Sequence, residues 1–599
     1  MRRTFATMIV AVLIVLYSHT DARAQEGSDA PDIAPLVECA EQKELVLPTE
    51  KCMLEEAFWS AQWAMQSSAA QALDAVNARF AQGTGELAAL ARNLEEDTNK
   101  LAEVESGYFA ALGLSDGLVR EARLAELNPQ LEQIKQRLQS VEIALQDRFP
   151  EYSQLVAPQP LTVAETQAML GPEDALFMAL PGETGTFVFL LTHETADWHR
   201  SSLTRSDLTI IVDELRLSMG VNGVLTGVRS FQEDGPIFDR SLAFELYTNL
   251  FGPLASKIGS ADHLYATVSG PLTAFPMGAM VTQAPEGSDS NPDAMRGTSW
   301  LQRDVAITVL PAPTSLRALA ERKKTNADRA FLGIGNACTG WGVVGAPKPP
   351  VELCGRIEGE EQVAAKDRVA ASNSRSGLRF SKAARAGKVP VLSADELRFS
   401  MSYLPGTRTE LLAIASLLSA DPEYDLIMAR DASEALLRSS NSQLSESRVI
   451  VFATHGLVAT DGIENLDEPG LVLTPPSVAS ALDDGFLSAS EIAADLTLDA
   501  DFVVLSACNT ASPAKSGADS LSGLARAFFY AGARSLLVSH WPVEDDIAPQ
   551  ITTATIENFD RTPANGRSRA LKEALLPLMD DPETADPYYW APFVLVGQN

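Results

Sequence analysis

Histidine and cysteine are scarce in this sequence, which has six histidines and five cysteines among 599 residues. No G-x-x-x-x-G-K-[ST] phosphate loop is present, and GIGN at residues 333–336 lacks the full dinucleotide-binding pattern. His193 and His199 stand without the cysteine or carboxylate spacing of a metal-ligand set, so the sequence predicts no zinc site. We therefore expect an activity that uses no metal and no cofactor.

Positive charge is also in short supply. The chain has 47 Lys and Arg residues against 79 Asp and Glu residues, a formal net charge of −32. Such an excess repels nucleic acid and anionic lipid surfaces, so neither is expected as the main ligand. The hydrophobic share of 46% is ordinary for globular protein, and the length allows several domains with a large core.

The first 24 residues have the three parts of a secretory signal peptide. Arg2 and Arg3 precede an apolar run over residues 5–17, and Ala22-Arg23-Ala24 supplies an A-x-A cleavage pattern. The run is shorter than the roughly 20 residues of a membrane span, although an uncleaved anchor is the alternative. No later segment is apolar enough to cross a bilayer. The sequence thus predicts an exported protein, periplasmic or extracellular.

Four of the cysteines form two local pairs that suit an oxidising compartment. Cys39 and Cys52 lie near the mature N-terminus, and Cys338 and Cys354 lie in a stretch rich in Gly and Pro. Either pair can close a small disulfide loop, although spacing alone leaves the pairing open. Cys508 is the odd cysteine, which in a secreted protein indicates a free, reactive thiol.

Residues 25–155 are expected to form a helical, coiled-coil-like region. Leucines recur at three-, four- and seven-residue steps around residues 87–101, and Leu, Ile and Val residues do the same around 131–145. No fixed-period helical repeat is evident, so a hairpin or small bundle is expected. This region is either a scaffold or an arm that binds a regulatory protein.

Strands and helices alternate after residue 160, which predicts an α/β fold with a sheet flanked by helices. We place an α/β half at 160–330 and a second half at 404–599. Between them, residues 339–403 are rich in Gly, Pro, Ser and Ala and carry a basic run, which predicts a flexible basic insert. Its arginines are possible sites of self-processing, and a solvated linker is the alternative.

Two apolar runs in the second half each end in a reactive side chain. In VIVFATHGLV (449–458) the run ends at His455, and in DFVVLSACNTA (501–511) it ends at Cys508. Ligands of open parallel sheets bind at the carboxyl ends of the strands. If the two strands are neighbours, His455 and Cys508 face one cleft.

Together these residues suit covalent catalysis. A thiolate is the nucleophile, and a nearby imidazole can help to generate it and later protonate a leaving amine. The backbone amides of Gly456 and Cys508 can bind the oxyanion of a tetrahedral intermediate. Taken singly, a buried cysteine or a histidine at a strand end is more often structural.

From about residue 260 to the end, the chain resembles the CHAT domain family, caspase-like clan CD cysteine peptidases related to separase. The resemblance rests on these segments, in order: SGPLTAFPMGAM, FATHG, EPGLVLTPP, DGFLSASEIAADLTLDADFVVLSACNTA, LSGLARAFFYAGARSLLVSHWPVEDD and YYWAPFVLVG. It implies a His455/Cys508 dyad and a caspase-like fold, with a pseudo-caspase half near 160–330. SHW stands where SLW is commoner in the family, so His540 is an added histidine, expected to be structural or pocket-lining.

Acidic residues follow the predicted strand at 534–542. The resemblance to separase places an acidic residue here for arginine at P1, the substrate residue before the cut. It carries over to Asp545 with Asp546 as substitute, while Trp541 and Asp519 are further candidates for substrate binding. The alternative is that these carboxylates favour the dipole at a helix N-terminus.

The sequence therefore predicts an exported cysteine endopeptidase that acts on a protein or peptide substrate. A caspase-like scaffold that binds peptides without cutting them is one alternative. A transamidase that passes the same thioester to an amine is the other.

Overall fold

The structure is a computed structural model that describes part of the chain. The described residues are 54–62, 64–65, a few single helical residues between 100 and 144, 160–221, 237–258, 261–317, 325–343, 345–355, 393–457, 468–480, 483–507, 510 and 523–599. The chain divides into two units, Met1–Glu55 and Glu56–Asn599. Only helical residues 54 and 55 of the first unit are described, and the sheets and the helices that cover them belong to the second unit. The predicted signal peptide, most of the helical region and the basic run of the insert lie outside the described residues.

Within the described part of the chain, one sheet of eleven strands spans the second unit, in the order β3-β2-β1-β4-β5-β14-β13-β12-β8-β6-β7. Its strands are β1 (Asp174–Gly182), β2 (Gly185–Thr192), β3 (Ala196–Ser201), β4 (His263–Val268), β5 (Ala306–Val309), β6 (Arg329–Gly335), β7 (Leu426–Met428), β8 (Ser447–Ala453), β12 (Phe502–Ser506), β13 (Ser535–Ser539) and β14 (Phe593–Gly597).

Nine of the eleven strands form two groups of neighbouring parallel strands, and β2 and β3 add an antiparallel edge. β1, β4, β5 and β14 run parallel to one another, as do β13, β12, β8, β6 and β7. The last strand of the chain, β14, joins the groups because it is parallel to β5 and antiparallel to β13. The expected α/β fold, a large sheet flanked by helices, is confirmed, and the sheet is continuous across the two sequence regions.

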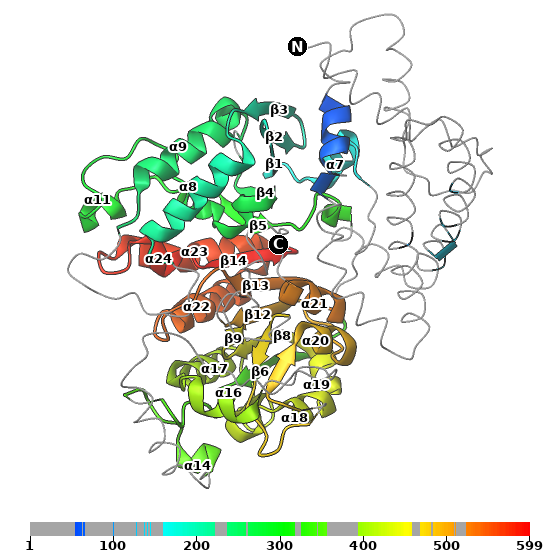
Figure 1. Cartoon of the computed structure of the whole chain (residues 1–599), viewed down its shortest axis with the longest axis vertical. Coiled ribbons are helices and arrows are strands. Elements are labelled where there is room, and N and C mark those ends of the chain that lie inside the picture. Colours follow the sequence, from blue (N-terminus) through cyan, green and yellow to red (C-terminus); the bar gives the residue numbers. More distant parts are fainter. Residues whose placement is uncertain are drawn as a thin grey trace, which may run out of the picture. The chain divides into compact units, whose positions relative to one another are not determined.

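Helices pack on the faces of this sheet (Figure 1). The helices whose bounds the structure gives, including some that lie away from the sheet, are α7 (Val163–Met169), α8 (Arg205–Ser218), α9 (Arg240–Leu250), α10 (Ala255–Ile258), α11 (Pro292–Arg296), α12 (Leu301–Asp304), α14 (Val351–Cys354), α16 (Ala394–Ser400), α17 (Pro405–Leu417), α18 (Glu434–Ser439), α19 (Asn441–Glu446), α20 (Ala489–Asp495), α21 (Gly523–Ala531), α22 (Ala548–Arg561), α23 (Gly566–Asp580) and α24 (Pro587–Trp590).

The strands of the second half are buried on both faces, which explains their nearly continuous apolar sequence. In β8, Val449 and Val451 face the core that contains α17, α22 and α23, while Ile450 and Phe452 face the core that contains α19, α20 and α21. Figure 1 shows β8, β12 and β13 between these two sets of helices. The apolar runs therefore end where the strands leave the two cores, at the edge where polar residues begin.

The first half opens with the hairpin that the sequence predicts. β1 and β2 pair antiparallel from Ala175 with Thr192 to Gly182 with Gly185, so only Glu183 and Thr184 form the turn. A positive φ of 144° at Gly185 suits a residue without a side chain, because a Cβ there would lie 2.5 Å from the Ser201 carbonyl oxygen.

A small second sheet stands beside the end of β8. It has the order β11-β10-β9 and contains β9 (Gly456–Leu457), β10 (Gly470–Val472) and β11 (Phe486–Ser488). Because β9 begins at the residue after His455, this sheet supports the histidine from its C-terminal side.

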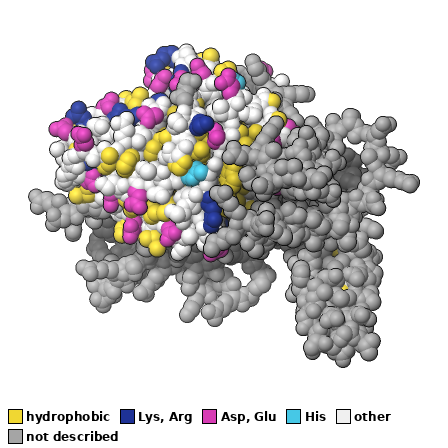
Figure 2. All heavy atoms as spheres, turned by 90° about the horizontal axis from the view of Figure 1, so that it is seen from above, with side chains coloured by type: hydrophobic (Ala, Val, Ile, Leu, Met, Phe, Trp, Pro, Cys, Tyr) yellow, Lys and Arg dark blue, Asp and Glu magenta, His cyan; other side chains and the backbone are white. Residues whose placement is uncertain are grey.

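The surface is polar and mixed in charge. Figure 2 shows acidic and basic side chains interspersed with apolar ones on the described part of one face. Among the described residues, no helix combines the length and the apolar character that a membrane crossing requires.

Candidate active site

The expected adjacency of the two strand ends is present. β8 and β12 are neighbouring parallel strands, and Ala453 is paired with Ser506. The amide of Thr454 also donates to the Ser506 carbonyl oxygen at 3.2 Å. His455 stands two residues after Ala453, and Cys508 stands two residues after Ser506 in the sequence. Cys508 itself lies outside the described residues.

His455 is held by a backbone carbonyl. Its side chain is half-buried, and Nε2 lies 2.7 Å from the carbonyl oxygen of Ser402. Since a carbonyl can only accept, Nε2 carries the proton, and in the neutral ring Nδ1 keeps the lone pair. Burial lowers the pKa of His455 below its ordinary value, although the hydrogen bond to Ser402 acts in the opposite direction. The ring is therefore neutral at pH 7 and has one nitrogen that can accept a proton.

Gly456 lies on β9, opposite Leu471 of β10. The adjacent pair is hydrogen-bonded, because the amide of Val472 donates to the carbonyl of His455 at 2.9 Å. Paired residues of an antiparallel ladder alternate between hydrogen-bonded and non-hydrogen-bonded positions. The N–H of Gly456 therefore points away from β10.

Polar contacts hold the chain on both sides of position 508. The hydroxyl of Ser506 donates to Oε2 of Glu410 at 3.0 Å. The hydroxyl of Ser539, at the end of β13, donates to the carbonyl of Ala507 at 2.6 Å, and its amide donates to Oγ1 of Thr510 at 2.8 Å. The end of β12 is thus tied to both α17 and β13.

Glu410 is an acid inside the core of the second half. It lies on α17, is 1% exposed, and accepts from the hydroxyls of Ser506 and Thr552, the latter at 2.6 Å. Burial raises its pKa to about 7, against the effect of those two hydrogen bonds. This glutamate therefore changes its charge near neutral pH, in contact with the last residue of β12.

The two acidic residues expected after β13, Asp545 and Asp546, differ in their exposure to solvent. Asp545 is half-buried and its Oδ2 accepts from the amide of Gly406, at the N-terminus of α17, across 2.8 Å. Burial, with the nearby charge of Asp546, raises the pKa of Asp545. Asp546 is exposed. Asp545 thus caps a helix distant in sequence and lies at the same edge of the sheet as His455, while Asp519 lies outside the described residues.

Trp541 does not face the expected cleft. It is 1% exposed, and its Nε1 donates to the carbonyl of Tyr588 at 3.0 Å. Trp541 stands two residues after the end of β13, and its indole is enclosed in the core. The expectation that it contacts substrate is therefore corrected: Trp541 is a packing residue.

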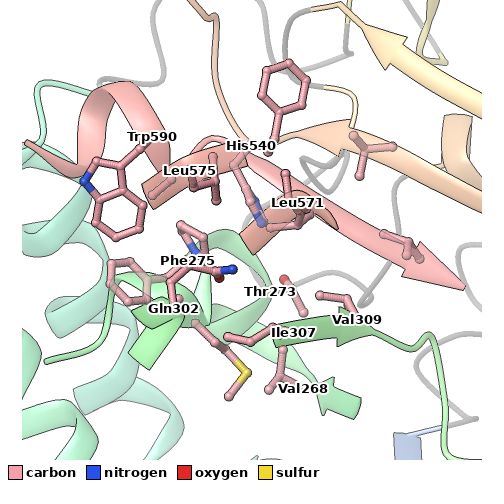
Figure 3. A pocket seen from close by; sticks show the side chains of 18 of the residues that line it. Val268, Thr273, Phe275, Gln302, Ile307, Val309, His540, Leu571, Leu575 and Trp590 are labelled. Carbon is pink, nitrogen blue, oxygen red and sulfur yellow. The ribbon is translucent and has the colours of Figure 1, made fainter. Parts of the chain in front are cut away.

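His540 lines a cavity beside the sheet. Figure 3 shows its ring among Thr273, Gln302 and apolar side chains of β4, β5, β13, β14, α23 and α24. The cavity has a volume of about 40 Å³, enough for a few water molecules only. Burial and the nearby charge of Arg216 lower the pKa of His540 to about 3, so this ring stays neutral. Its placement is the structural, pocket-lining one that the sequence suggests.

One of the two local cysteine pairs forms a disulfide. Cys338 and Cys354 are bonded, with their Cα atoms 5.7 Å apart. Cys39 and Cys52 lie outside the described residues. The two ends of the predicted flexible insert are structured, since α14 carries Cys354, and α16 leads to Ser402. Within the described part of the chain, no three His, Cys, Asp or Glu side chains form a group that could hold a metal ion.

Comparison with known proteins identifies the domain. The family model of the CHAT domain matches residues 240–598. The chain belongs to the CHAT domain family. The match covers more than half of the chain and begins earlier than the boundary at 260 inferred from motifs.

Solved structures similar to this chain include two of the Saccharomyces cerevisiae separase–securin complex. They share 9% and 10% sequence identity with it, at TM-scores of 0.35 and 0.37. The alignments cover 100% of this chain but only 43% and 44% of those chains, so this protein spans less than half of their length. No curated protein matches the chain.

Sequence reasoning missed two partners of this CHAT site. The first is the backbone carbonyl of Ser402, which bonds to His455. Every residue has a backbone carbonyl, so no sequence motif predicts this contact. The second is Glu410, which does fit a sequence pattern. Glu410, Leu411 and Ile414 follow Thr407 at three-, four- and seven-residue spacing, and all four residues are on the buried face of α17. A carboxylic acid at a buried position of an amphipathic helix is unusual, so this pattern could have predicted Glu410 as a functional residue.

Proposed function

We propose that this CHAT domain is a cysteine endopeptidase that uses His455 and Cys508. The observation that carries the proposal is the pairing of Ala453 with Ser506 on adjacent parallel strands, each two residues before one member of the dyad. Strand neighbours lie about 4.8 Å apart, which suits an imidazole and a thiol that exchange a proton.

The tautomer of His455 supports its role as general base. With Nε2–H donated to Ser402, the basic Nδ1 accepts the thiol proton of Cys508. The thiolate attacks the scissile carbonyl carbon, and the resulting oxyanion is bound by the amides of Gly456 and Cys508. The imidazolium then protonates the leaving amine, and water hydrolyses the thioester.

We infer a preference for a basic P1 residue. Asp545 and Asp546 follow β13 at the same edge of the sheet, and Asp519 belongs to the sequence between Cys508 and α21. A carboxylate there would pair with an arginine or lysine side chain of the substrate. Charge reversal tests this: Asp546→Lys should lower kcat/KM for Arg-P1 peptides more than tenfold relative to peptides with an apolar P1.

Export is the proposed setting of this activity. The signal-peptide pattern of residues 1–24 supports it, and so does the disulfide Cys338–Cys354, because disulfides persist in oxidising compartments. We propose the periplasm or the extracellular space, with a regulatory protein bound by the helical region at 25–155.

A peptide library digested with the purified chain tests the proposal. Cleavage sites are mapped by mass spectrometry for the wild type, His455→Ala and Cys508→Ala. We expect hydrolysis in the wild type and a loss of at least a thousandfold in both variants. Products that gain water support a peptidase, whereas joined peptides indicate a transamidase. Peptide binding by a folded wild type that cuts nothing would instead indicate a scaffold.

A further inference from the structure

We propose that Thr339 and the Cys338–Cys354 disulfide position the Ser402 carbonyl, and through it the imidazole of His455. The inference rests on the proposed peptidase function, since it names the elements that orient its base. Thr339 and the disulfide touch neither substrate nor reacting atoms, so they act as positioning elements.

Two donors meet at one carbonyl oxygen. The hydroxyl of Thr339 donates to the Ser402 oxygen at 2.9 Å, and Nε2 of His455 lies 2.7 Å from the same atom. Thr339 is 1% exposed, so its hydroxyl has little water to bond with instead. A carbonyl oxygen has two lone pairs, so these two bonds fill its capacity and fix its direction.

Ser402 needs such support because it lies between elements. α16 ends at Ser400 and α17 begins at Pro405, so no helix or strand ladder holds the peptide at 402. Its carbonyl can turn unless neighbouring contacts prevent it. The orientation of the base thus depends on a connecting segment.

The segment at 336–342 supplies those contacts along its length. The hydroxyl of Tyr403 donates to Oδ1 of Asn336 at 2.7 Å. The amides of Trp341 and Gly342 donate to the carbonyls of Arg398 and Phe399 at 3.3 and 3.1 Å. Residues 336–342 therefore line up against residues 398–403, with the Thr339–Ser402 bond in the middle.

The disulfide closes the loop that carries Thr339. Cys338 is the residue before Thr339, and its amide donates to Oγ1 of Thr474 at 2.9 Å. Inside the loop, Nζ of Lys348 donates to the carbonyls of Gly340, Trp341 and Val343, at 3.0, 2.7 and 2.9 Å. A covalent closure and a shared ammonium group thus restrict the motion of the loop, and the restriction reaches Thr339.

Activity is the first test. Thr339→Val keeps the shape of the side chain and removes the hydroxyl. One lost hydrogen bond should lower kcat about 3- to 10-fold while KM changes little, and Thr339→Ser should restore most of the loss. The matched control is Thr186→Val, which removes a buried threonine hydroxyl that donates to the carbonyl of Leu203 at 2.7 Å in the first half. An equal loss of kcat in the control would overturn the inference.

The second test needs no peptidase activity. In a Cys508→Ala background, the Nε2 proton of His455 is followed by NMR and assigned with His455→Ala. We expect its exchange with solvent to be slow, and about 10-fold faster after Thr339→Val or after the paired change Cys338→Ser with Cys354→Ser. Exchange that is unchanged in Thr339→Val would reject the positioning role, even if the wild type cleaves peptides. Faster exchange in a chain that cleaves nothing would retain the positioning role and reject only the peptidase.

Discussion

Ser506 donates its hydroxyl to Oε2 of Glu410 across 3.0 Å, at the last residue of β12 and two residues before Cys508. This contact joins the end of β12 to a carboxyl group, and burial raises the pKa of that group to about 7. The charge of Glu410 near neutral pH therefore affects the hydrogen bond that it forms with Ser506 at the end of β12.

The stability of the fold should depend on the proton of Glu410. The folded pKa of about 7 lies above the ordinary value of 4.5, so the folded state binds more protons in that window and its stability falls as pH rises from about 4.5 to 7. Glu410→Gln removes this titration. We expect the difference in unfolding free energy between pH 4.5 and pH 8 to shrink by roughly 3 kcal/mol, measured by chemical denaturation. The exposed Glu446→Gln is the control, and an undiminished pH dependence in Glu410→Gln would contradict the assignment.

His455 should titrate below its ordinary pKa of 6.5, because burial disfavours the imidazolium. In this case the folded state binds fewer protons than the unfolded state, so protonation of His455 weakens the fold as pH falls. NMR titration of the ring in Cys508→Ala measures the pKa directly. In the wild type, the acid limb of kcat/KM should have its midpoint below pH 6.5, and a midpoint above 6.5 would refute the neutral base.

Cys508 should be the cysteine that reacts fastest with iodoacetamide. The disulfide protects Cys338 and Cys354. In the proposed dyad, the neutral imidazole of His455 promotes formation of the thiolate at Cys508. Mass spectrometry of the alkylated protein gives the rate at each cysteine. We expect His455→Ala to slow labelling of Cys508 at least about tenfold at pH 7, whereas equal rates in both proteins would count against an activated thiol.

Two glycines of the disulfide loop form a matched pair. Gly340 and Gly345 have φ of 85° and 84°, but a Cβ at Gly340 would lie 2.5 Å from the amide nitrogen of Tyr403, while a Cβ at Gly345 meets nothing within 4 Å. Gly345→Ala should cost roughly 1 kcal/mol of backbone strain. Gly340→Ala should cost a further 1–3 kcal/mol or so, because the segment at 402–403 must move.

Thermal unfolding and kcat together separate the effect of backbone strain, which both variants have, from the effect of crowding against Tyr403, which only Gly340→Ala has. We expect Gly340→Ala to lower both, and Gly345→Ala to lower only the unfolding temperature. Equal kcat in the two variants would show that crowding at Tyr403 does not reach His455.

The local patterns of the sequence determined the elements of this protein. Apolar runs predicted β8 and β12 because both faces of those strands are buried, and alternation around a short turn predicted the β1–β2 hairpin. The runs end just before His455 and Cys508, so the local sequence was enough to select both residues as candidates for the proposed dyad. The close spacing of Cys338 and Cys354 in the sequence likewise made this disulfide one of the two predicted local pairs.

Tertiary structure alone decided which of these ends meet and what orients them. The pairing of β8 with β12, and the joining of two parallel groups by β14, are contacts between distant parts of the chain that no periodicity encodes. The partner of His455 is the carbonyl of Ser402, a group that every residue has. The position of Trp541 just after a strand suggested an accessible side chain, but the side chain is enclosed. Its burial depends on the whole sheet and on the helices that cover it, which the local sequence does not encode.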